Sequence, residues 1–285
     1  MDITTPLVRA LLQEQFPAWA DLPIRPVHRQ GNDNRTFRLG DRMSVRLPSA
    51  KPYAAGIAKE DRALAILSAH ITTQLPDVIA TGAPSEHFPL PWSVRRWLPG
   101  TVPAEAPDLD RHQFAEDLAQ FLVQLRAVPT EGGPACGAHS FFRGCHPSVY
   151  ADQVQQALTE LGDRVDQASC RRTWQEALTS AWPHEPVWFH GDVAEGNLLV
   201  QGSTLGAVID LGTCGVGDPA CDLVIAWTFF DQERNTFRAA VDVDDDTWAR
   251  ARGWALWKAL VTLPEPAGSQ YQAQQRALAT LLTAP

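Results

Sequence analysis

Three polar side chains in the second half of the chain have the types and the spacing that metal-assisted group transfer requires. Asp192 and Asn197 lie five positions apart in one short segment, and Asp210 follows in a run that reads Asp-Leu-Gly. Carboxylate and amide oxygens are hard ligands that suit Mg²⁺, so we expect Asn197 and Asp210 to hold that ion. Asp192 is then predicted to orient an acceptor hydroxyl and to take its proton. Together these residues would serve transfer of a phosphoryl group, whose negative charge needs a cation beside it.

Each of these motifs alone is a weak signal, because Gly and Asp favour turns wherever they occur. Their combination is more specific. Short apolar runs at 198–200 and 208–209 flank the polar residues, and the Asp-to-Asn spacing matches that of a kinase catalytic loop. His190 precedes the pair in the run His-Gly-Asp. Since Asp192 already fills the role of base, we interpret His190 as a residue that fixes the loop by packing and hydrogen bonding.

The elements that must position these residues change in pattern near residue 99. Upstream, β-prone runs separated by turn residues alternate with one helical pattern at 54–69; the runs lie at 24–29, 35–39, 43–47, 77–80 and 92–97. Downstream, apolar residues recur at helical spacing from Phe114 to Leu125, and further helical patterns lie at 148–161, 171–181, 219–230, 247–262 and 270–282. Short β-prone pieces remain at 187–189, 198–200 and 207–209. We therefore expect an α+β, bilobal fold: a small β-rich N-lobe with one helix at 1–98, and a mainly helical C-lobe at 99–285.

The chain resembles the aminoglycoside phosphotransferase family, whose members have a protein-kinase-like fold. The resemblance rests on the runs at 190–197 and 209–212, on Gly-Asp-Pro-Ala-Cys-Asp-Leu at 217–223, and on the segment 91–100 that looks like the family's hinge. It implies Mg²⁺-dependent transfer of the γ-phosphoryl group of ATP or GTP to a hydroxyl of a small molecule. It also implies a nucleotide bound at the hinge formed by Arg96, Trp97 and Leu98.

The predicted N-lobe departs from the kinase pattern at two positions. A kinase covers its phosphates with a glycine-rich loop, whereas the segment 30–34 offers only Gly31, with Asn34 at its end. This segment is either a phosphate cradle or a plain hairpin turn. Where the family usually has a lysine on the third strand, this chain has Arg46, whose planar fork also suits phosphate. Glu60 in the predicted helix is its expected partner; the alternative is a solvated surface pair worth about 0–1 kcal/mol.

Three further features have competing interpretations. Asp218 precedes Pro219 and a helical run, which favours an N-cap. Asp222 either holds the backbone of the catalytic loop or complements a helix dipole. The cluster of Cys136, His139, Cys145 and His146 contains soft ligands, but adjacent Cys145 and His146 do not readily point at one ion. We interpret it as a loop with incidental thiols rather than as a zinc site.

Composition excludes several other classes of protein. Of 285 residues, 24 are Lys or Arg and 33 are Asp or Glu, a formal net charge of −9, which is the wrong sign for neutralising a nucleic-acid backbone. No apolar run approaches the roughly 20 residues of a membrane helix, and the start lacks a signal-peptide pattern. Five widely spaced cysteines are typical of reduced thiols. We expect a cytoplasmic monomer or homodimer without nucleic-acid or membrane partners.

The acceptor is the least determined part of this prediction. Acids at Glu195, Asp231, Glu233 and 242–246, with the net negative charge, favour a polycationic acceptor such as an aminoglycoside, and hence antibiotic resistance. One alternative is a kinase of a non-antibiotic metabolite or another alcohol, such as an amino alcohol, a sugar or a macrolide. Another is a catalytically silent, nucleotide-binding pseudokinase, suggested by the poor glycine-rich loop and by Arg46.

Overall fold

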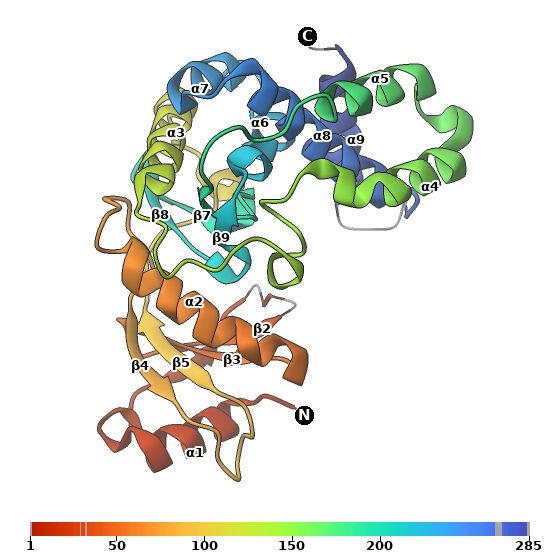
Figure 1. Ribbon diagram of the computed structural model, residues 1–285. Helices are drawn as coiled ribbons and strands as arrows, with labels where there is room; N and C mark the ends of the chain where they lie inside the picture. Colours follow the sequence, from red (N-terminus) through yellow and green to blue (C-terminus); the bar gives the residue numbers. More distant parts are fainter. Residues whose placement is uncertain (1, 29, 32, 266–269, 284–285) are drawn as a thin grey trace. The chain divides into compact units, whose positions relative to one another are not determined.

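The computed structural model describes residues 2–28, 30–31, 33–265 and 270–283, and the chain divides into two compact units. The first unit holds the residues up to Gly100 together with Ala207–Gly212. The second unit holds Thr101–Gly206 and the chain from Thr213 onward. The first unit is built around a sheet and the second mainly from helices (Figure 1). This is the α+β architecture that the change of pattern near residue 99 predicts.

A five-stranded antiparallel sheet forms the centre of the first unit. Its strands are β1 (Ile24–Pro26), β2 (Asn34–Leu39), β3 (Met43–Pro48), β4 (Val78–Gly82) and β5 (Trp92–Arg96), in the spatial order β1-β2-β3-β5-β4. All five predicted runs form strands. The run predicted at 24–29 is shorter than expected, since β1 ends at Pro26, and Arg29 at its predicted end lies outside the described residues.

The two faces of this sheet differ in chemistry. Side chains alternate along a strand and residues directly opposite each other share a face. The register pairs Val45 with Val94 and Arg46 with Ser93, so one face is apolar and the other carries arginine. Helix α1 (Thr5–Gln15) contributes Val8, Leu11 and Leu12 to the buried cluster that includes Val45 and Val94. Helix α2 (Ala54–Leu67) brings its acidic residues to the arginines of the other face.

Helix α1 is a correction to the sequence prediction, which placed one helix in this lobe. Its signals were present: Pro6 lies at the start of the helix, where a missing N–H costs nothing, and Leu7, Val8, Leu11 and Leu12 are spaced along one helical face. Three of these four are fully buried beneath the sheet. The predicted helix at 54–69 is confirmed as α2.

Helices form most of the second unit. They are α3 (Arg111–Ala127), α4 (Ala151–Leu161), α5 (Gln167–Ala177), α6 (Ile225–Thr228), α7 (Arg234–Val241), α8 (Asp245–Thr262) and α9 (Tyr271–Thr283). The helix predicted at 219–230 is instead a 3₁₀ helix, Pro219–Val224, followed by the single turn of α6. Helix α7 was not predicted. None of the helices in the described part of the chain is long and apolar enough to cross a membrane.

Two small β-ribbons interrupt these helices. Strands β6 (Val187–Phe189) and β9 (Gly215–Gly217) pair antiparallel, and β7 (Leu198–Gln201) pairs with β8 (Thr204–Val208). The first ribbon leads directly into the His-Gly-Asp segment, and the second follows Asn197 and leads toward Asp210. Strand β9 was not predicted. Both ribbons therefore anchor the segments that carry the predicted chemistry.

Candidate active site

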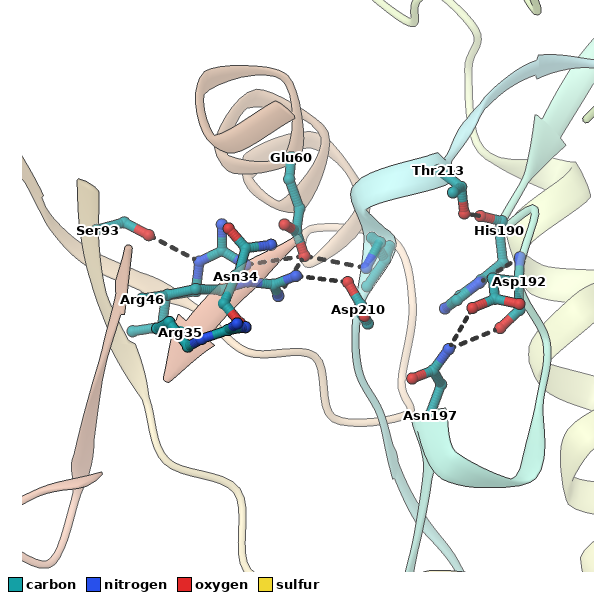
Figure 2. Close-up of polar contacts among 12 residues, drawn as sticks. Asn34, Arg35, Arg46, Glu60, Ser93, His190, Asp192, Asn197, Asp210 and Thr213 are labelled. Atoms are coloured by element: carbon teal, nitrogen blue, oxygen red, sulfur yellow. Dashed lines mark hydrogen bonds and ion pairs between the residues drawn. The ribbon is translucent and has the colours of Figure 1, made fainter. Parts of the chain in front are cut away.

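The segment between β6 and β7 holds Asp192 and Asn197 in direct contact. The amide nitrogen of Asn197, Nδ2, donates hydrogen bonds to the backbone oxygen of Asp192 at 2.9 Å and to its carboxylate Oδ2 at 3.0 Å (Figure 2). Both side chains are half-buried. The hydrogen bonds fix the orientation of the Asp192 carboxylate, and because both come from Nδ2 they leave the amide oxygen of Asn197 for another ligand.

The turn before Asp192 requires glycine. Gly191 has φ +84°, a conformation that L side chains rarely adopt, and a Cβ there would lie 2.9 Å from the backbone oxygen of Thr213. The hydroxyl of Thr213 donates to the backbone oxygen of His190 at 2.9 Å, which ties the turn to the segment before β9. His190 is fully buried, and its Nδ1 accepts from the backbone N–H of Asp192 at 3.1 Å. These contacts agree with its interpretation as a residue that fixes the loop.

Asp222 holds the backbone of the same turn. Its carboxylate is 2 % exposed and accepts hydrogen bonds from the backbone N–H groups of His190 and Gly191, both at 2.7 Å. Burial raises the pKa of Asp222, and the electrostatic interaction with His190 and these two hydrogen bonds only partly offset that effect. Of the two interpretations that the sequence leaves open, the contacts support the one in which Asp222 holds the catalytic loop.

Asp218 is an N-cap, as predicted, and is also half of a buried ion pair. Its Oδ1 accepts from the backbone N–H of Ala220 at 3.0 Å at the start of the 3₁₀ helix. Its Oδ2 accepts from Arg250 Nε on α8 at 2.7 Å, and the two side chains are 5 % and 0 % exposed. The pair fixes the segment after β9 against α8, so its role is structural support for the loop.

In the first unit, Arg46 joins two carboxylates. Its Nη1 lies 3.0 Å from Glu60 Oε1 on α2, and its Nη2 lies 2.5 Å from Asp210 Oδ1 (Figure 2). The predicted pairing of Arg46 with Glu60 is therefore present. It is not a solvated surface pair, because the Glu60 side chain is 1 % exposed. Burial alone lowers the pKa of Arg46, but the charges of Glu60 and Asp210 more than offset this and raise the pKa above its usual value.

Asp210 has an unusual backbone conformation. Its φ is +62°, in the left-handed region that few residues other than glycine adopt, and the next N–H, of Leu211, donates to Glu60 Oε1 at 3.0 Å. The Asp210 side chain remains 43 % exposed. Such conformations persist where the surrounding structure holds them in place and are concentrated at functional sites. Here Arg46 and Glu60 hold the segment, and the carboxylate stays accessible.

The segment 30–34 contributes Asn34 rather than a glycine cradle. When the amide oxygen of Asn34 faces Arg46, it accepts from Nη2 at 2.9 Å and from Nε at 3.2 Å. Gly31 is exposed, and a Cβ there would meet nothing closer than the backbone oxygen of Asn34 at 3.7 Å. Steric fit therefore gives no requirement for glycine at this position. Asn32, inside the same segment, lies outside the described residues.

Two of the three predicted hinge residues contact residues other than Arg46, Glu60 and Asp210. Arg96 is exposed and pairs with Asp77 at 2.9 Å, and the guanidinium of Arg38 lies 4.8 Å from the centre of the Trp97 ring. Leu98 is buried. Arg96 and Leu98 also line a cavity of about 320 Å³ with residues 71–75 and Asp77. Their role in nucleotide binding stays a prediction.

Each of the two predicted metal ligands has an oxygen of the type that suits Mg²⁺. Asn197 offers an amide oxygen and Asp210 an accessible carboxylate, and Mg²⁺ commonly binds through one or two protein oxygens plus the phosphates of a substrate. The soft cluster is different. His139 contacts the backbone oxygen of Ala135, and the thiols of Cys145 and Cys136 lie 3.3 Å apart. Within the described residues, no three His, Cys, Asp or Glu side chains gather closely enough to hold a metal.

Several of the acids predicted to attract a cationic acceptor have structural partners instead. Glu233 accepts from Arg111 at 3.2 Å, Asp244 caps α8 by accepting from the N–H of Thr247 at 2.6 Å, and Asp245 pairs with Arg238 at 2.6 Å. An acid that already balances a helix or an arginine contributes less to the field that a ligand experiences. The electrostatic argument for a polycation is therefore weaker than the sequence suggests.

Two functional candidates escaped the sequence analysis. Arg95 on β5 and Asp61 on α2 form an ion pair with 2.6 Å between Nη2 and Oδ1, and Arg95 also lies 2.8 Å from Glu60. One signal for Arg95 was available: an arginine inside an apolar run that reads as a strand needs a buried partner. The identity of that partner depends on a distant helix, so the run alone does not reveal it.

Comparison with known proteins agrees with this geometry. The chain matches the family model of APH, the phosphotransferase enzyme family, over residues 24–254. No curated protein sequence matches it significantly. Among solved structures, the GDP complex of wild-type aminoglycoside 2'-phosphotransferase-IIIa has a TM-score of 0.74 at 19 % identity, covering 98 % of this chain and 97 % of that one.

Two further solved structures extend the comparison. ADP-bound aminoglycoside phosphotransferase APH(2'')-Ib has a TM-score of 0.66 at 13 % identity, over 99 % of this chain and 97 % of that one. The apoenzyme of macrolide 2'-phosphotransferase MphH from Brachybacterium faecium has a TM-score of 0.65 at 21 % identity, over 98 % of each chain. These likenesses confirm the predicted bilobal, protein-kinase-like fold.

Proposed function

Because the chain belongs to the APH family of phosphotransferase enzymes, we propose that it transfers the γ-phosphoryl group of ATP or GTP to a hydroxyl of an aminoglycoside-like acceptor. The observation that carries the proposal is the hydrogen bond between Asn197 Nδ2 and the Asp192 carboxylate, within a family match that spans both units. This contact supports the proposal because it joins a carboxylate and an amide, the group types that a proton acceptor and a Mg²⁺ ligand require.

Asp192 is the proposed catalytic base. Its Oδ2 is held by Asn197, and the backbone on its N-terminal side is held by His190, Thr213 and Asp222. A carboxylate fixed in this way orients the acceptor hydroxyl and takes its proton as the oxygen attacks the γ-phosphorus atom. The bond between that phosphorus and the bridging oxygen of the nucleoside diphosphate breaks in the same displacement.

Asn197 and Asp210 are the proposed metal ligands, through the amide oxygen of Asn197 and the carboxylate of Asp210. When bound, Mg²⁺ would neutralise charge on the phosphoryl group and on the departing diphosphate. Arg46 contacts Asp210 at 2.5 Å, so this carboxylate would have to give up part of its contact with arginine in order to hold Mg²⁺. Arg46 and Asn34 would then face the phosphates, and Glu60 would fix the position of Arg46.

The proposed nucleotide is ATP or GTP. The similar solved structures include complexes with GDP and with ADP. The predicted nucleotide contacts are Arg96, the last residue of β5, and the two residues that follow it, Trp97 and Leu98. If Arg96 gave up its ion pair with Asp77, its guanidinium would be able to contact a nucleotide.

A second acceptor class, an apolar or macrolide-like alcohol, is favoured by a different observation. Phe141 and Phe142 are 52 % and 42 % exposed, in a loop whose Gly144 backbone oxygen accepts from the N–H of Asp218 at 2.8 Å. Exposed aromatic side chains near a functional loop suit an apolar ligand better than a polycation. The likeness to a macrolide phosphotransferase points the same way.

The deciding experiment is a turnover assay. The full chain is incubated with Mg²⁺ and ATP or GTP against aminoglycosides, macrolides, amino alcohols and sugars, and phosphorylated product is identified by mass spectrometry. Asp192→Asn is the matched blank, because the change removes the base and retains the size of the side chain. We expect one acceptor class to be phosphorylated by the native chain and turnover to fall by about 1,000-fold or more in the variant.

Each outcome has a distinct meaning. If only a macrolide is phosphorylated, the acceptor is apolar rather than an aminoglycoside, and the proposed mechanism is unchanged. Binding of Mg²⁺-nucleotide without product from any acceptor favours a pseudokinase. Equal turnover by Asp192→Asn contradicts the role of Asp192 as base.

A further inference from the structure

Arg95 is an almost completely buried cation in the middle of a sheet. It lies on β5, which has β3 on one side and β4 on the other, and its side chain is 2 % exposed. A buried charge is tolerated only when it is paired and hydrogen-bonded. Its partners are therefore integral to the fold of the first unit, and they include residues of the proposed nucleotide site.

Three side chains surround the Arg95 guanidinium. Its Nε donates to Ser93 Oγ at 3.1 Å, and its Nη2 donates to Asp61 Oδ1 at 2.6 Å. Its Nη1 lies 2.8 Å from Glu60 Oε1, where the pairing is by charge, because the N–H bonds of Nη1 do not point at an acceptor. Arg95 thus holds two consecutive carboxylates of α2 through two different nitrogens.

The strand register explains how Arg95 meets the partner of Arg46. Arg46 is opposite Ser93, and Ser44 is opposite Arg95, so both arginines lie on the same face of the sheet. Glu60 lies against that face with one oxygen, Oε1, within 3.0 Å of both guanidinium groups. Removing Arg95 would leave Arg46 as the one arginine of this pair beside Glu60.

The charges of the cluster are closely balanced. Two arginines, Arg46 and Arg95, face three carboxylates, those of Glu60, Asp61 and Asp210. Burial raises the pKa of Asp61, an effect that the charge of Arg95 offsets in part. Without Arg95, Arg46 would have to balance all three carboxylates and would be less available to an incoming anion.

We propose that Arg95 is a positioning residue for nucleotide binding. It balances the charges of Glu60 and Asp61, and this leaves the guanidinium of Arg46 directed at the phosphates. The inference rests on the proposed function, since it requires that Arg46 contacts a nucleotide. Arg95 itself touches neither phosphate nor acceptor. It acts by fixing the position of Glu60 and by sharing its charge.

The test compares Arg95→Met with the native full chain in steady-state assays with Mg²⁺-ATP or Mg²⁺-GTP, whichever supports turnover. We expect the KM for nucleotide to rise about tenfold or more, the KM for acceptor to stay the same, and kcat to change by less than about threefold. Arg95→Lys retains the charge but not the fork, so its nucleotide KM is expected to rise by a smaller factor.

A charge-balance rescue separates positioning from mere packing. Arg95→Met combined with Asp61→Asn removes one cation and one anion, so the nucleotide KM is expected to fall back toward the native value. A general loss of packing would not be relieved by a second change at a buried site. Arg62→Met is the matched control, because Arg62 is the exposed arginine beside Asp61 on the same helix.

Four results decide the matter. A native nucleotide KM in Arg95→Met, with only a lower melting temperature, overturns the inference. If that variant does not fold, Arg95→Lys replaces it, and a native nucleotide KM in Arg95→Lys overturns the inference in the same way. A raised KM that the second change lowers supports it. Absence of turnover in the native chain itself would refute the proposed function instead.

Discussion

The two units hold their functional carboxylates and loops by different means. In the second unit, the turn that carries Asp192 is held through its backbone: Asp222 accepts from two N–H groups, and Thr213 donates to the oxygen of His190. In the first unit, Asp210 and Glu60 are held chiefly by side-chain charge, through Arg46. One arrangement depends on hydrogen-bond geometry, and the other on the balance of charges.

This difference suggests a division of tasks. A backbone held by a buried carboxylate has one arrangement, because each N–H needs its acceptor at a defined place. A cluster of arginines and carboxylates has several arrangements of similar energy and responds to an added anion or cation. The proposed base therefore belongs to the rigid part, and the proposed ligands of nucleotide and metal belong to the responsive part.

The largest expected effect comes from Asp210→Asn in the charge-held cluster. The change removes both a proposed metal ligand and a partner of Arg46, so we expect turnover to fall by about 1,000-fold, or about 4 kcal/mol. Nucleotide affinity without Mg²⁺ should be unchanged or tighter, because Arg46 is released. Steady-state assays measure turnover, and calorimetric titration measures the nucleotide affinity with and without Mg²⁺. A Mg²⁺-supported affinity equal to that of the native chain would exclude Asp210 as a ligand.

Asp222→Asn tests the backbone-held turn. The two N–H groups donate to different oxygens of the carboxylate and asparagine keeps only one of these oxygens, so one buried donor loses its acceptor at a cost of about 1–3 kcal/mol. We expect kcat to fall by about 100-fold while nucleotide affinity stays within about threefold, since the charge cluster of the first unit is intact. Asp166→Asn, at the exposed N-cap of α5, is the matched control because asparagine also caps helices. A loss of nucleotide affinity equal to the loss in kcat would contradict the division of tasks.

The backbone-held turn is also the part that sequence analysis located best. Its residues are consecutive, from His190 to Asn197, and the constraint on Gly191 acts over a few positions. A local motif carries its own geometry, so spacing alone reveals it. The same holds for the strands β2, β3 and β5, whose β-prone composition agrees with their place in the sheet.

The sequence predicted only part of the charge-held cluster, for a physical reason. Arg46 and Glu60 have the spacing of a strand and its following helix, but Arg95 joins them only because β5 pairs with β3 in one particular register. Strand β9 shows the same limit. Its two glycines have low strand propensity, yet a Cβ on Gly217 would lie 2.4 Å from the backbone oxygen of Gly144, so close packing determines the sequence there.

Gly191→Ala is expected to have a smaller effect on the same turn. The residue has φ +84°, and the new Cβ would lie 2.9 Å from the backbone oxygen of Thr213, so the turn must shift. We expect a cost of about 1–2 kcal/mol in stability and a fall in kcat of about tenfold. Thermal melting and steady-state kinetics measure the two. Gly196→Ala is the matched control, since nothing lies within 4 Å of a Cβ there. Native kcat in Gly191→Ala would show that the turn is less rigid than the comparison requires.

Arg46→Lys has the smallest expected effect and tests the other side of the comparison. Lysine keeps the positive charge, so the balance against Glu60 and Asp210 is preserved, but a single ammonium group cannot reach both carboxylates as the fork does at 3.0 and 2.5 Å. We expect the nucleotide KM to rise by about three- to tenfold with kcat nearly unchanged. Arg25→Lys, at an exposed position of β1, controls for the substitution itself. If the KM stays native, the cluster works by charge alone and the fork geometry is dispensable, which would sharpen the contrast with the turn at Asp192. If kcat falls as strongly as in Asp222→Asn, the cluster is as geometrically strict as the turn, and the proposed division between a rigid and a responsive part is wrong.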